Sequence, residues 1–301
     1  MKFLCLHGAF GNASNFQAQL GPFVSKAKES GDHISFKWIS GRHEAIPPAG
    51  FSDYFGRGPL YRFIPFDGIE ALDDVLHKLD EFPQGETAED TIRQLIQSDY
   101  GSQYTLDGVR TSIEYILDAV REDPEIEGIL GFSEGATAAA SAILEEKRLW
   151  EEEGVPRQLK CAIFFAGWPP LSLKGGQCNV ILADESEDAI DIPTCHVVGS
   201  DDPYIDGAMS LHSMCDQDSA VLFDHGSGHF IPREPQTLSE LTAAINAMTE
   251  QAEASFSSHS SHSDTESISE IRKSIDGFSM LSDDCSSASS VDSGDYGDEK
   301  S

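Results

Sequence analysis

Short apolar segments alternate with helix-like segments along the first 250 residues. Several of these apolar segments contain hardly any polar residue, and they span residues 3–6, 34–39, 128–132, 161–165, 194–198 and 220–223. Strands that are apolar throughout are typical of parallel sheets covered by helices on both faces. The alternation therefore predicts an α/β domain with a mostly parallel central sheet flanked by helices.

Helical patterns fill most of the intervals between the strands, and they cover residues 14–28, 105–121, 135–150 and 235–248. Residues 41–104 break the alternation, because they contain five prolines with a group of aromatic residues between them. A connection of this length inside a compact domain usually has a function. We therefore expect a lid or a wall of the substrate pocket there, and a structural cover for one sheet edge is the alternative.

The composition changes near residue 251. The segment 251–301 contains 17 serines, 11 acidic residues and 3 basic residues among its 51 positions. Such a segment has too little apolar surface to offset the entropy lost on ordering it. We therefore predict one globular domain over residues 1–250 and a disordered, acidic, serine-rich tail over residues 251–301.

The net charge argues against two classes of partner. The chain has 52 acidic against 20 basic side chains, a formal net charge of −32. This excess repels the phosphates of nucleic acids and anionic membrane surfaces, so we expect neither as a partner. No apolar run approaches the roughly 20 residues that span a bilayer. The first residues lack the pattern of a signal peptide.

The six cysteines form no CxxC pair. Cys5, Cys161 and Cys195 fall within predicted strands. Free, buried thiols are a better interpretation than a disulfide framework, and they favour a cytoplasmic protein.

The motif Gly-Phe-Ser-Glu-Gly at residues 131–135 is the strongest chemical signal. It follows an apolar strand and precedes an alanine-rich helix, which is the setting of a nucleophile elbow. In such an elbow a serine stands on a strained turn, and small neighbours let strand and helix approach each other. Ser133 is therefore the predicted nucleophile, with a simple glycine-serine turn as the alternative.

A serine nucleophile needs a base, and the base needs an orienting carboxylate. In α/β-hydrolases they follow the serine in the order Asp or Glu, then His. The strand at 194–198 runs into Gly-Ser-Asp-Asp-Pro, where Asp202 is the preferred acid and Asp201 the alternative. A turn with a helix-capping aspartate would have the same sequence pattern.

The candidate base lies in a glycine-rich loop after the strand at 220–223. His229 is preferred because the glycines around it allow the loop to reach Ser133. His225 is closer to the strand end and is expected to pack or hydrogen-bond locally. The four-residue spacing of the histidines invites a zinc site, but the glycines between them disfavour a helix and no HExxH glutamate is present. We expect neither a metal nor an organic cofactor.

Two backbone N–H groups should stabilise the oxyanion of the reaction. One is that of Glu134, directly after the nucleophile. The other is expected from the turn after the first strand, where Ala9 or Phe10 would donate. His7, at the end of that strand, is interpreted as a buried structural residue. The turn contains neither GxGxxG nor GK[ST], so a phosphate-binding loop is not indicated.

Four stretches together resemble the fungal serine hydrolase family of α/β-hydrolases: FLCLHGAFGNASNF, GILGFSEGATAAA, HVVGSDDPYI and HGSGHFIP. The resemblance covers about residues 1–248. It implies an α/β-hydrolase fold, with Ser133 as nucleophile, Asp202 as orienting acid and His229 as base. The family includes esterases and thioesterases of fungal polyketide clusters. The resemblance therefore implies a hydrolase of acyl thioesters or esters in secondary-metabolite biosynthesis.

The substrate is expected to carry an apolar acyl group, because aromatic residues crowd the insertion at 41–104. Residues 33–65 also hold a local excess of positive charge, from Lys37, Arg42, Arg57 and Arg62. We hypothesise that this basic patch meets the acyl carrier domain of a polyketide synthase. Ion pairs within the insertion are the alternative explanation.

Two other functions fit the sequence. One is a general carboxylesterase acting on a small free metabolite, which a comparison of thioesters with oxygen esters would distinguish. The other is a non-catalytic, hydrolase-like binding protein, which failure of a fluorophosphonate probe to label Ser133 would favour.

Overall fold

The fold is taken from a computed structural model of the chain, which describes residues 1–29, 34–47, 55–56, 58–67, 84–97 and 103–255. The chain divides into two compact units, Met1–Ala254 and Ser255–Ser301. The predicted tail at 251–301 lies outside the described residues except for its first five positions. The central sheet and the residues expected at the site all belong to the first unit.

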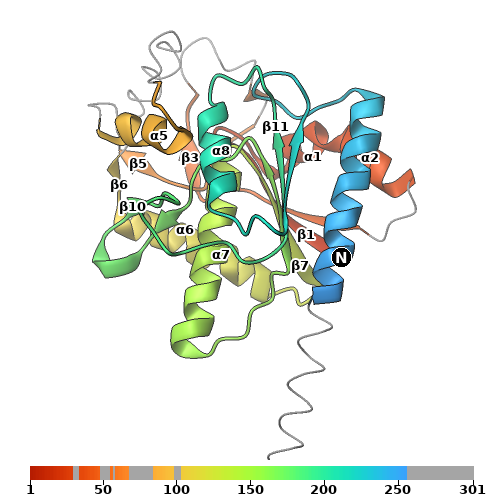
Figure 1. The fold of residues 1–301 in the computed structure, drawn as a ribbon. Coiled ribbons are helices and arrows are strands. Elements are labelled where there is room, and N and C mark those ends of the chain that lie inside the picture. Colours follow the sequence, from red (N-terminus) through yellow and green to blue (C-terminus); the bar gives the residue numbers. More distant parts are fainter. Residues whose placement is uncertain (30–33, 48–54, 57, 68–83, 98–102, 256–301) are drawn as a thin grey trace, which may run out of the picture. The chain divides into compact units, whose positions relative to one another are not determined.

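Six parallel strands form the central sheet of this unit (Figure 1). They are β1 (Lys2–Leu6), β2 (Ser35–Ile39), β7 (Ile126–Phe132), β8 (Cys161–Phe165), β11 (Thr194–Val198) and β12 (Ala220–Asp224). Their order across the sheet is β12-β11-β8-β7-β1-β2, and every neighbouring pair is parallel. Each predicted strand is present, which confirms the predicted parallel sheet.

The helices that cover the sheet are α1 (Ala13–Gln19), α2 (Gly21–Glu29), α6 (Leu106–Arg121), α7 (Glu134–Glu153), α8 (Ile205–Ser213) and a last helix over residues 235–255. The predicted helix at 14–28 is wrong as a single element, because the chain ends α1 at Gln19 and restarts at Gly21. The last helix runs past the predicted end at residue 248 and includes the first residues of the predicted tail.

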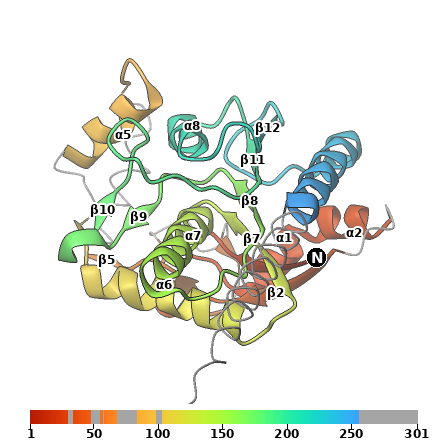
Figure 2. The same cartoon turned by 60° about the horizontal axis from the view of Figure 1, so that its bottom comes forward.

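Alternate side chains of the strands enter two separate apolar layers. In β1, Leu4 and Leu6 pack with residues of α6 and α7, whereas Phe3 and Cys5 pack with residues of α1, α2 and the last helix. The turned view shows α6, α7 and α8 on one side of the sheet, and α1, α2 and the last helix on the other (Figure 2). Burial on both faces explains why the strands are apolar throughout.

The strand order reverses between β1 and β7. The chain passes from β1 outward to the edge strand β2 and later returns to β7, on the other side of β1. In open parallel sheets, the crevice beyond the carboxyl ends of the strands at such a reversal is the preferred place for a ligand site. The loop after β1 and the turn after β7 both lie at this reversal of strand order.

The described part of the insertion at 41–104 consists of small elements. Strand β3 (His43–Ala45) pairs with β4 (Leu60–Arg62), and β5 (Phe66–Asp67) pairs with β6 (Gln103–Tyr104), both antiparallel. Helix α5 (Ala88–Gln97) lies beside α8. Arg93 holds α5 through ion pairs to Asp184 and Glu185, each 2.6 Å long. Other parts of the insertion, Arg57 among them, lie outside the described residues.

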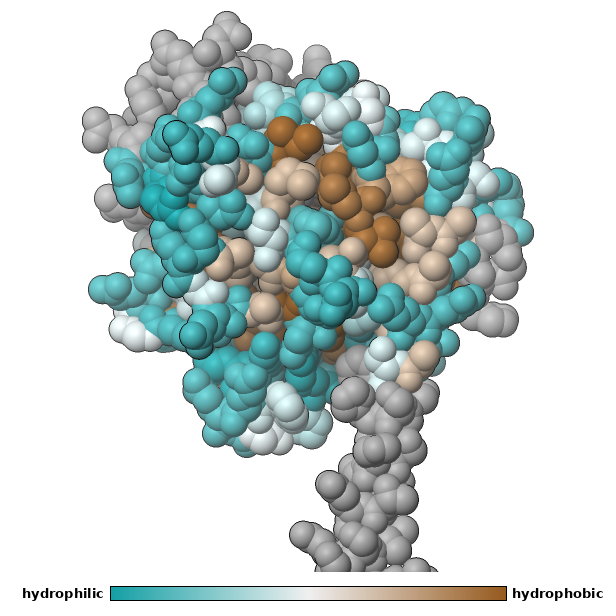
Figure 3. Space-filling view, viewed as in Figure 1, coloured by the Kyte–Doolittle hydropathy of each residue, from teal (hydrophilic) through white to brown (hydrophobic). Residues whose placement is uncertain are grey.

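A hairpin and an edge strand complete the unit. Strands β9 (Leu171–Ser172) and β10 (Asn179–Val180) pair antiparallel around a short 3₁₀ turn, η2 (Lys174–Gly176). Strand β12 ends the sheet, and the space-filling view shows apolar side chains gathered near it (Figure 3), where Leu222 is 44% exposed. No helix in the described part of the chain is long and apolar enough to cross a bilayer.

Candidate active site

Ser133 stands on a strained turn between β7 and α7. Its φ of 53° and ψ of −121° put a residue with a side chain in a sparsely populated backbone region. Glycines on both sides make the turn possible. A Cβ on Gly131 would lie 2.4 Å from the backbone of Ala136, and one on Gly135 would lie 2.3 Å from the carbonyl oxygen of Leu6. The turn has the geometry expected of a nucleophile elbow.

Three side chains that are distant in the sequence meet at this turn. His229 Nε2 lies 3.1 Å from Ser133 Oγ, and His229 Nδ1 lies 2.7 Å from Asp202 Oδ2. Because a carboxylate only accepts hydrogen bonds, Nδ1 carries the imidazole proton when the ring is neutral. Nε2 is then the acceptor for the Ser133 hydroxyl, which is the arrangement a general base requires.

The two aspartates of the Gly-Ser-Asp-Asp-Pro turn have different surroundings. The Asp202 side chain is 2% exposed, and its second oxygen accepts a hydrogen bond of 2.8 Å from the backbone N–H of Tyr204. Asp201 points outward and is exposed. The carboxylate that contacts His229 is therefore that of Asp202. The structure does not bring Asp201, the alternative acid, to the histidine.

Aromatic rings hold the imidazole of His229 in place. The ring of Phe132 lies 5.4 Å from it by centroids, and the ring of Tyr204 meets it edge-on at the same distance. Tyr204 in turn packs against Trp168, at 6.0 Å. The competing histidine, His225, is half-buried and packs against Phe230, in agreement with the expected local role.

The loop after β1 lies beside the elbow because Leu6 pairs with Gly131 across the sheet. Phe10 in this loop is buried and has a φ of 56°. In the described part of the chain, the N–H groups of Ala9 and Phe10 donate to no backbone acceptor. The N–H of Glu134 starts α7 and has no partner within its own helix. These are the three donors that the sequence proposes for the oxyanion.

His7 links the start of this loop to the insertion. It is 1% exposed, which confirms its expected burial. Its Nδ1 lies 2.7 Å from the carbonyl oxygen of Gly8, and its Nε2 accepts a hydrogen bond of 2.9 Å from the N–H of Gly41. The ring also packs on Phe63, at 4.6 Å. Burial lowers the pKa of His7, so the ring is neutral and its two nitrogens have fixed roles.

Sequence reasoning assigned the partner of the Glu134 side chain to a surface docking patch and missed its place at the site. This carboxylate is buried and pairs with Arg62, whose Nη2 and Nε lie 2.5 and 2.7 Å from Oε2. Its other oxygen accepts a hydrogen bond of 2.8 Å from the N–H of Phe63. A charged residue at the start of a helix that packs on the sheet is a signal for a counter-ion, because an unpaired buried charge is very costly.

This ion pair corrects one element of the predicted basic patch. Arg62 is 8% exposed and committed to Glu134, so it does not belong to a surface patch. Lys37 lies 3.7 Å from Asp123. Arg42 is exposed and lies over the ring of Tyr115. Arg62 is therefore ion-paired, as the alternative explanation expected, but its partner lies in α7 and not within the insertion.

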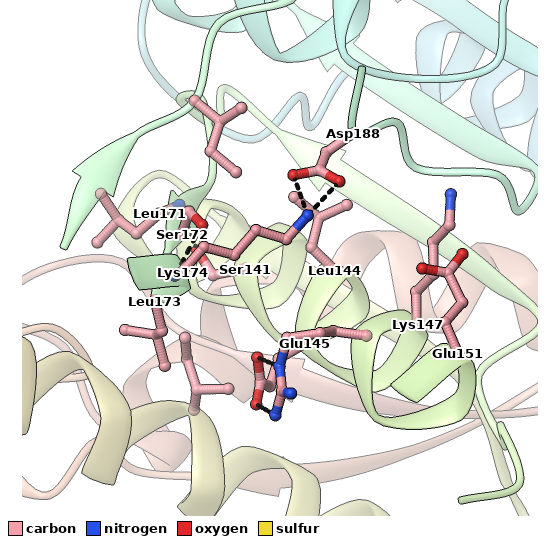
Figure 4. Close-up of a pocket in the computed structure, with 13 residues that line it drawn as sticks. Ser141, Leu144, Glu145, Lys147, Glu151, Leu171, Ser172, Leu173, Lys174 and Asp188 are labelled. Carbon is pink, nitrogen blue, oxygen red and sulfur yellow. Dashed lines mark hydrogen bonds and ion pairs between the residues drawn. The ribbon is translucent and has the colours of Figure 1, made fainter. Parts of the chain in front are cut away.

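A small pocket elsewhere on the domain is not a second site. It lies on the outer side of α7, next to β9 (Figure 4), and its volume is about 30 Å³, which is room for about one water molecule. Lys174 pairs with Asp188 at 2.7 Å, and Arg148 pairs with Glu145 at 2.8 Å. Among the described residues, no three His, Cys, Asp or Glu side chains form a group that could hold a metal ion.

The amino-acid sequence of the chain matches a known protein family. The sequence profile of the family described as serine hydrolase (FSH1) matches residues 1–241. The chain belongs to this family of serine hydrolases. The match includes all six strands of the sheet as well as Ser133, Asp202 and His229, and the α/β-hydrolase fold implied by the sequence resemblance is the fold observed.

Three relatives of this FSH1-family chain are fungal enzymes. Esterase FPY3 of Fusarium mangiferae is 26% identical over 84% of this chain and 98% of its own length. Hydrolase phiM of Talaromyces stipitatus is 25% identical over 82% of this chain and 87% of its own. Esterase FUS5 of Gibberella moniliformis is 31% identical over 81% of this chain and 85% of its own. The chain is accordingly a serine hydrolase of the esterase type.

Proposed function

We propose that the protein hydrolyses an acyl thioester or ester through an acyl-enzyme on Ser133, in fungal polyketide biosynthesis. The observation that carries the mechanism is the hydrogen-bonded series Ser133–His229–Asp202 on a strained elbow. The fungal esterases among the relatives support the substrate class. The free thiols of Cys5, Cys161 and Cys195, all buried, favour the cytoplasm as the compartment.

In the first half-reaction, Ser133 Oγ attacks the acyl carbonyl carbon and His229 Nε2 takes the hydroxyl proton. The carbonyl π electrons move to oxygen, and the oxyanion accepts hydrogen bonds from the N–H of Glu134 and of Ala9 or Phe10. When the carbon–sulfur or carbon–oxygen bond breaks, His229 gives its proton to the leaving thiolate or alkoxide. Asp202 keeps its negative charge and stabilises the imidazolium.

In the second half-reaction, His229 removes a proton from water, and the resulting hydroxide attacks the acyl-enzyme carbonyl. Collapse of this second oxyanion expels Ser133 Oγ, which recovers its proton from His229. The products are a carboxylic acid and the free enzyme. The two oxyanions occupy the same position, so one set of donors serves both steps.

The test is mass spectrometry of the intact protein after brief incubation with a fluorophosphonate and with candidate acyl thioesters. A mass increase on the peptide that contains Ser133, absent in Ser133→Ala, is the expected result. A folded protein that stays unlabelled by either reagent would contradict the proposal and favour the hydrolase-like binding protein.

A comparison of kcat/KM for matched thioester and oxygen-ester substrates separates the thioesterase from a general carboxylesterase. We expect the thioester to have the higher kcat/KM. We also expect long apolar acyl groups to be preferred over short ones, because aromatic residues of the insertion pack beside the oxyanion loop. Among these, Phe55 lies 5.0 Å from Phe10. A kcat/KM for the oxygen ester equal to or above that for the matched thioester would favour the carboxylesterase.

Docking of an acyl carrier domain is a separate part of the proposal. With Arg62 buried, the exposed Arg42 is the testable member of the basic patch. Arg42→Glu is expected to slow turnover of a carrier-bound acyl thioester while leaving a small soluble ester unaffected. Equal effects on both substrates would contradict docking at this face.

A further inference from the structure

The backbone and the side chain of Glu134 have different roles in the site. Its backbone N–H is a proposed oxyanion donor, and its side chain is a buried carboxylate with 9% exposure. The hydrogen bonds to this carboxylate come from consecutive residues of the insertion: Arg62, Phe63 and, at 3.4 Å, the N–H of Ile64. The carboxylate is thus held close to the place where negative charge develops during the reaction.

This position creates an electrostatic conflict. Attack by Ser133 would produce an oxyanion beside the N–H of Glu134, one side-chain length away from an existing carboxylate. Two negative charges that close in a water-poor site repel each other by several kcal/mol. A carboxylate in this place is compatible with catalysis only if a cation neutralises it.

Arg62 is placed to do this and also contacts the other half of the oxyanion site. Its guanidinium forms a paired contact with the Glu134 carboxylate and lies over the ring of Phe10, 5.5 Å from the centroid. Next to it, Tyr61 exchanges two backbone hydrogen bonds with Gly11, of 2.8 and 3.3 Å. One arginine therefore touches the segments that carry both proposed donors.

We propose that Arg62 is a positioning residue of the reaction: it neutralises the Glu134 carboxylate and holds Phe10, so that the oxyanion forms in a field that does not oppose it. The inference rests on the proposed esterase function. It assigns a role in the rate to a residue of the insertion, 72 positions from Glu134 in the sequence.

The sign of the charge left behind provides the test. Arg62→Met leaves an uncompensated anion near the oxyanion, so kcat for p-nitrophenyl butyrate should fall by about tenfold to a hundredfold with KM nearly unchanged. Glu134→Gln removes the anion, leaves a cation there and keeps an acceptor for the N–H of Phe63, so its kcat should exceed that of Arg62→Met by at least about tenfold. The double variant should recover to within about fivefold of Glu134→Gln.

A purely structural tether predicts a different pattern. In that case both single variants lose activity in proportion to their loss of thermal stability, and the double variant is the worst of the three. That outcome, or an Arg62→Met enzyme with wild-type kcat, would overturn the inference. Arg93→Met is the matched control, because it removes another ion-paired arginine of the insertion that contacts neither donor segment.

Two further readouts keep the test decisive. If Arg62→Met does not fold, the double variant, in which neither charge is left alone, is compared with Glu134→Gln, and a hundredfold gap between them would contradict charge neutralisation. The rate of fluorophosphonate labelling of Ser133 should follow the same order as kcat. A wild-type protein inert to both probe and ester would instead reject the proposed function itself.

Discussion

The reactivity of Ser133 depends on which nitrogen of His229 carries the proton. The buried Asp202 carboxylate fixes this by accepting from Nδ1, and a backbone N–H fixes Asp202 in turn. Phe132 and Tyr204 restrict the ring from two sides. The proton transfers proposed for these residues would thus use geometry that exists before substrate binds.

Replacing Ser133 by alanine should remove ester hydrolysis almost completely, by at least about a thousandfold in kcat, because it removes the hydroxyl on which the acyl-enzyme is proposed to form. The measurement is the initial rate with p-nitrophenyl butyrate. Since the side chain is small, the melting temperature should change little. A residual activity above a tenth of wild type would show that another residue is the nucleophile.

The neighbouring aspartates offer a matched pair of variants. Asp202→Asn should lower kcat by about 10⁴-fold, because the amide can donate to Nδ1 and so favours the wrong imidazole tautomer. Asp201→Asn changes an exposed side chain and should leave kcat within about twofold. The two enzymes would be compared at saturating substrate. The reverse result would make Asp201 the orienting acid.

Local pattern was sufficient to select the residues that the structure brings together at the elbow. Ser133, Asp202 and His229 each follow a strand, and each lies in a short motif whose chemistry can be interpreted without its neighbours. The Arg62–Glu134 pair could not be found in this way, because its partners are far apart in the sequence and neither lies in a pattern that names the other. The need for a partner becomes evident only from the structure, where the Glu134 carboxylate is 9% exposed.

At the scale of elements, the elbow requires that β7 and α7 approach the end of β1 very closely. Gly135→Ala should therefore destabilise the protein by about 1–3 kcal/mol and reduce kcat, because the new methyl group meets backbone that cannot move aside. Denaturant unfolding and ester hydrolysis measure the two effects.

Gly21→Ala is the control for this variant. A Cβ at Gly21, the first residue of α2, meets nothing within 4 Å. Alanine there should leave activity unchanged and stabilise the protein by up to about 1 kcal/mol. If both variants behave alike, close approach at the elbow is not the reason for Gly135.

The strands of the central sheet could be predicted from the sequence, whereas several helices could not. A strand buried on both faces must be apolar, so its sequence is distinctive. Helix α8 is short and contains Gly207, and α5 lies in a segment where prolines suggested a loop. The break between α1 and α2 falls at Leu20, directly before Gly21 and Pro22. Because proline has no N–H to continue α1, this dipeptide is a local signal for the break that apolar periodicity does not carry.

For the molecule as a whole, buried neutral histidines link stability to pH. Burial lowers the pKa of His196 to about 3 and also lowers that of His7. Above pH 6.5 these rings are neutral in both the folded and the unfolded state. As the pH falls below that value, these histidines become protonated in the unfolded chain but stay neutral in the folded protein. The free energy of unfolding therefore decreases.

The slope for each such histidine approaches about 1.4 kcal/mol per pH unit. We expect urea unfolding of His196→Gln to show a shallower decline between pH 6.5 and 4.5 than wild type, whatever its stability at pH 7. Comparing slopes removes the contribution of the many carboxylates, which both proteins share. Identical slopes would mean that His196 is protonated in the folded state.

The two backbone hydrogen bonds between Gly11 and Tyr61 have a practical consequence for protein engineering. They join the long insertion to the loop that carries two of the proposed oxyanion donors. A chimera that takes residues 41–104 from a relative is expected to change kcat as well as substrate selectivity. In such a chimera, Arg62 and its partner Glu134 should be replaced together.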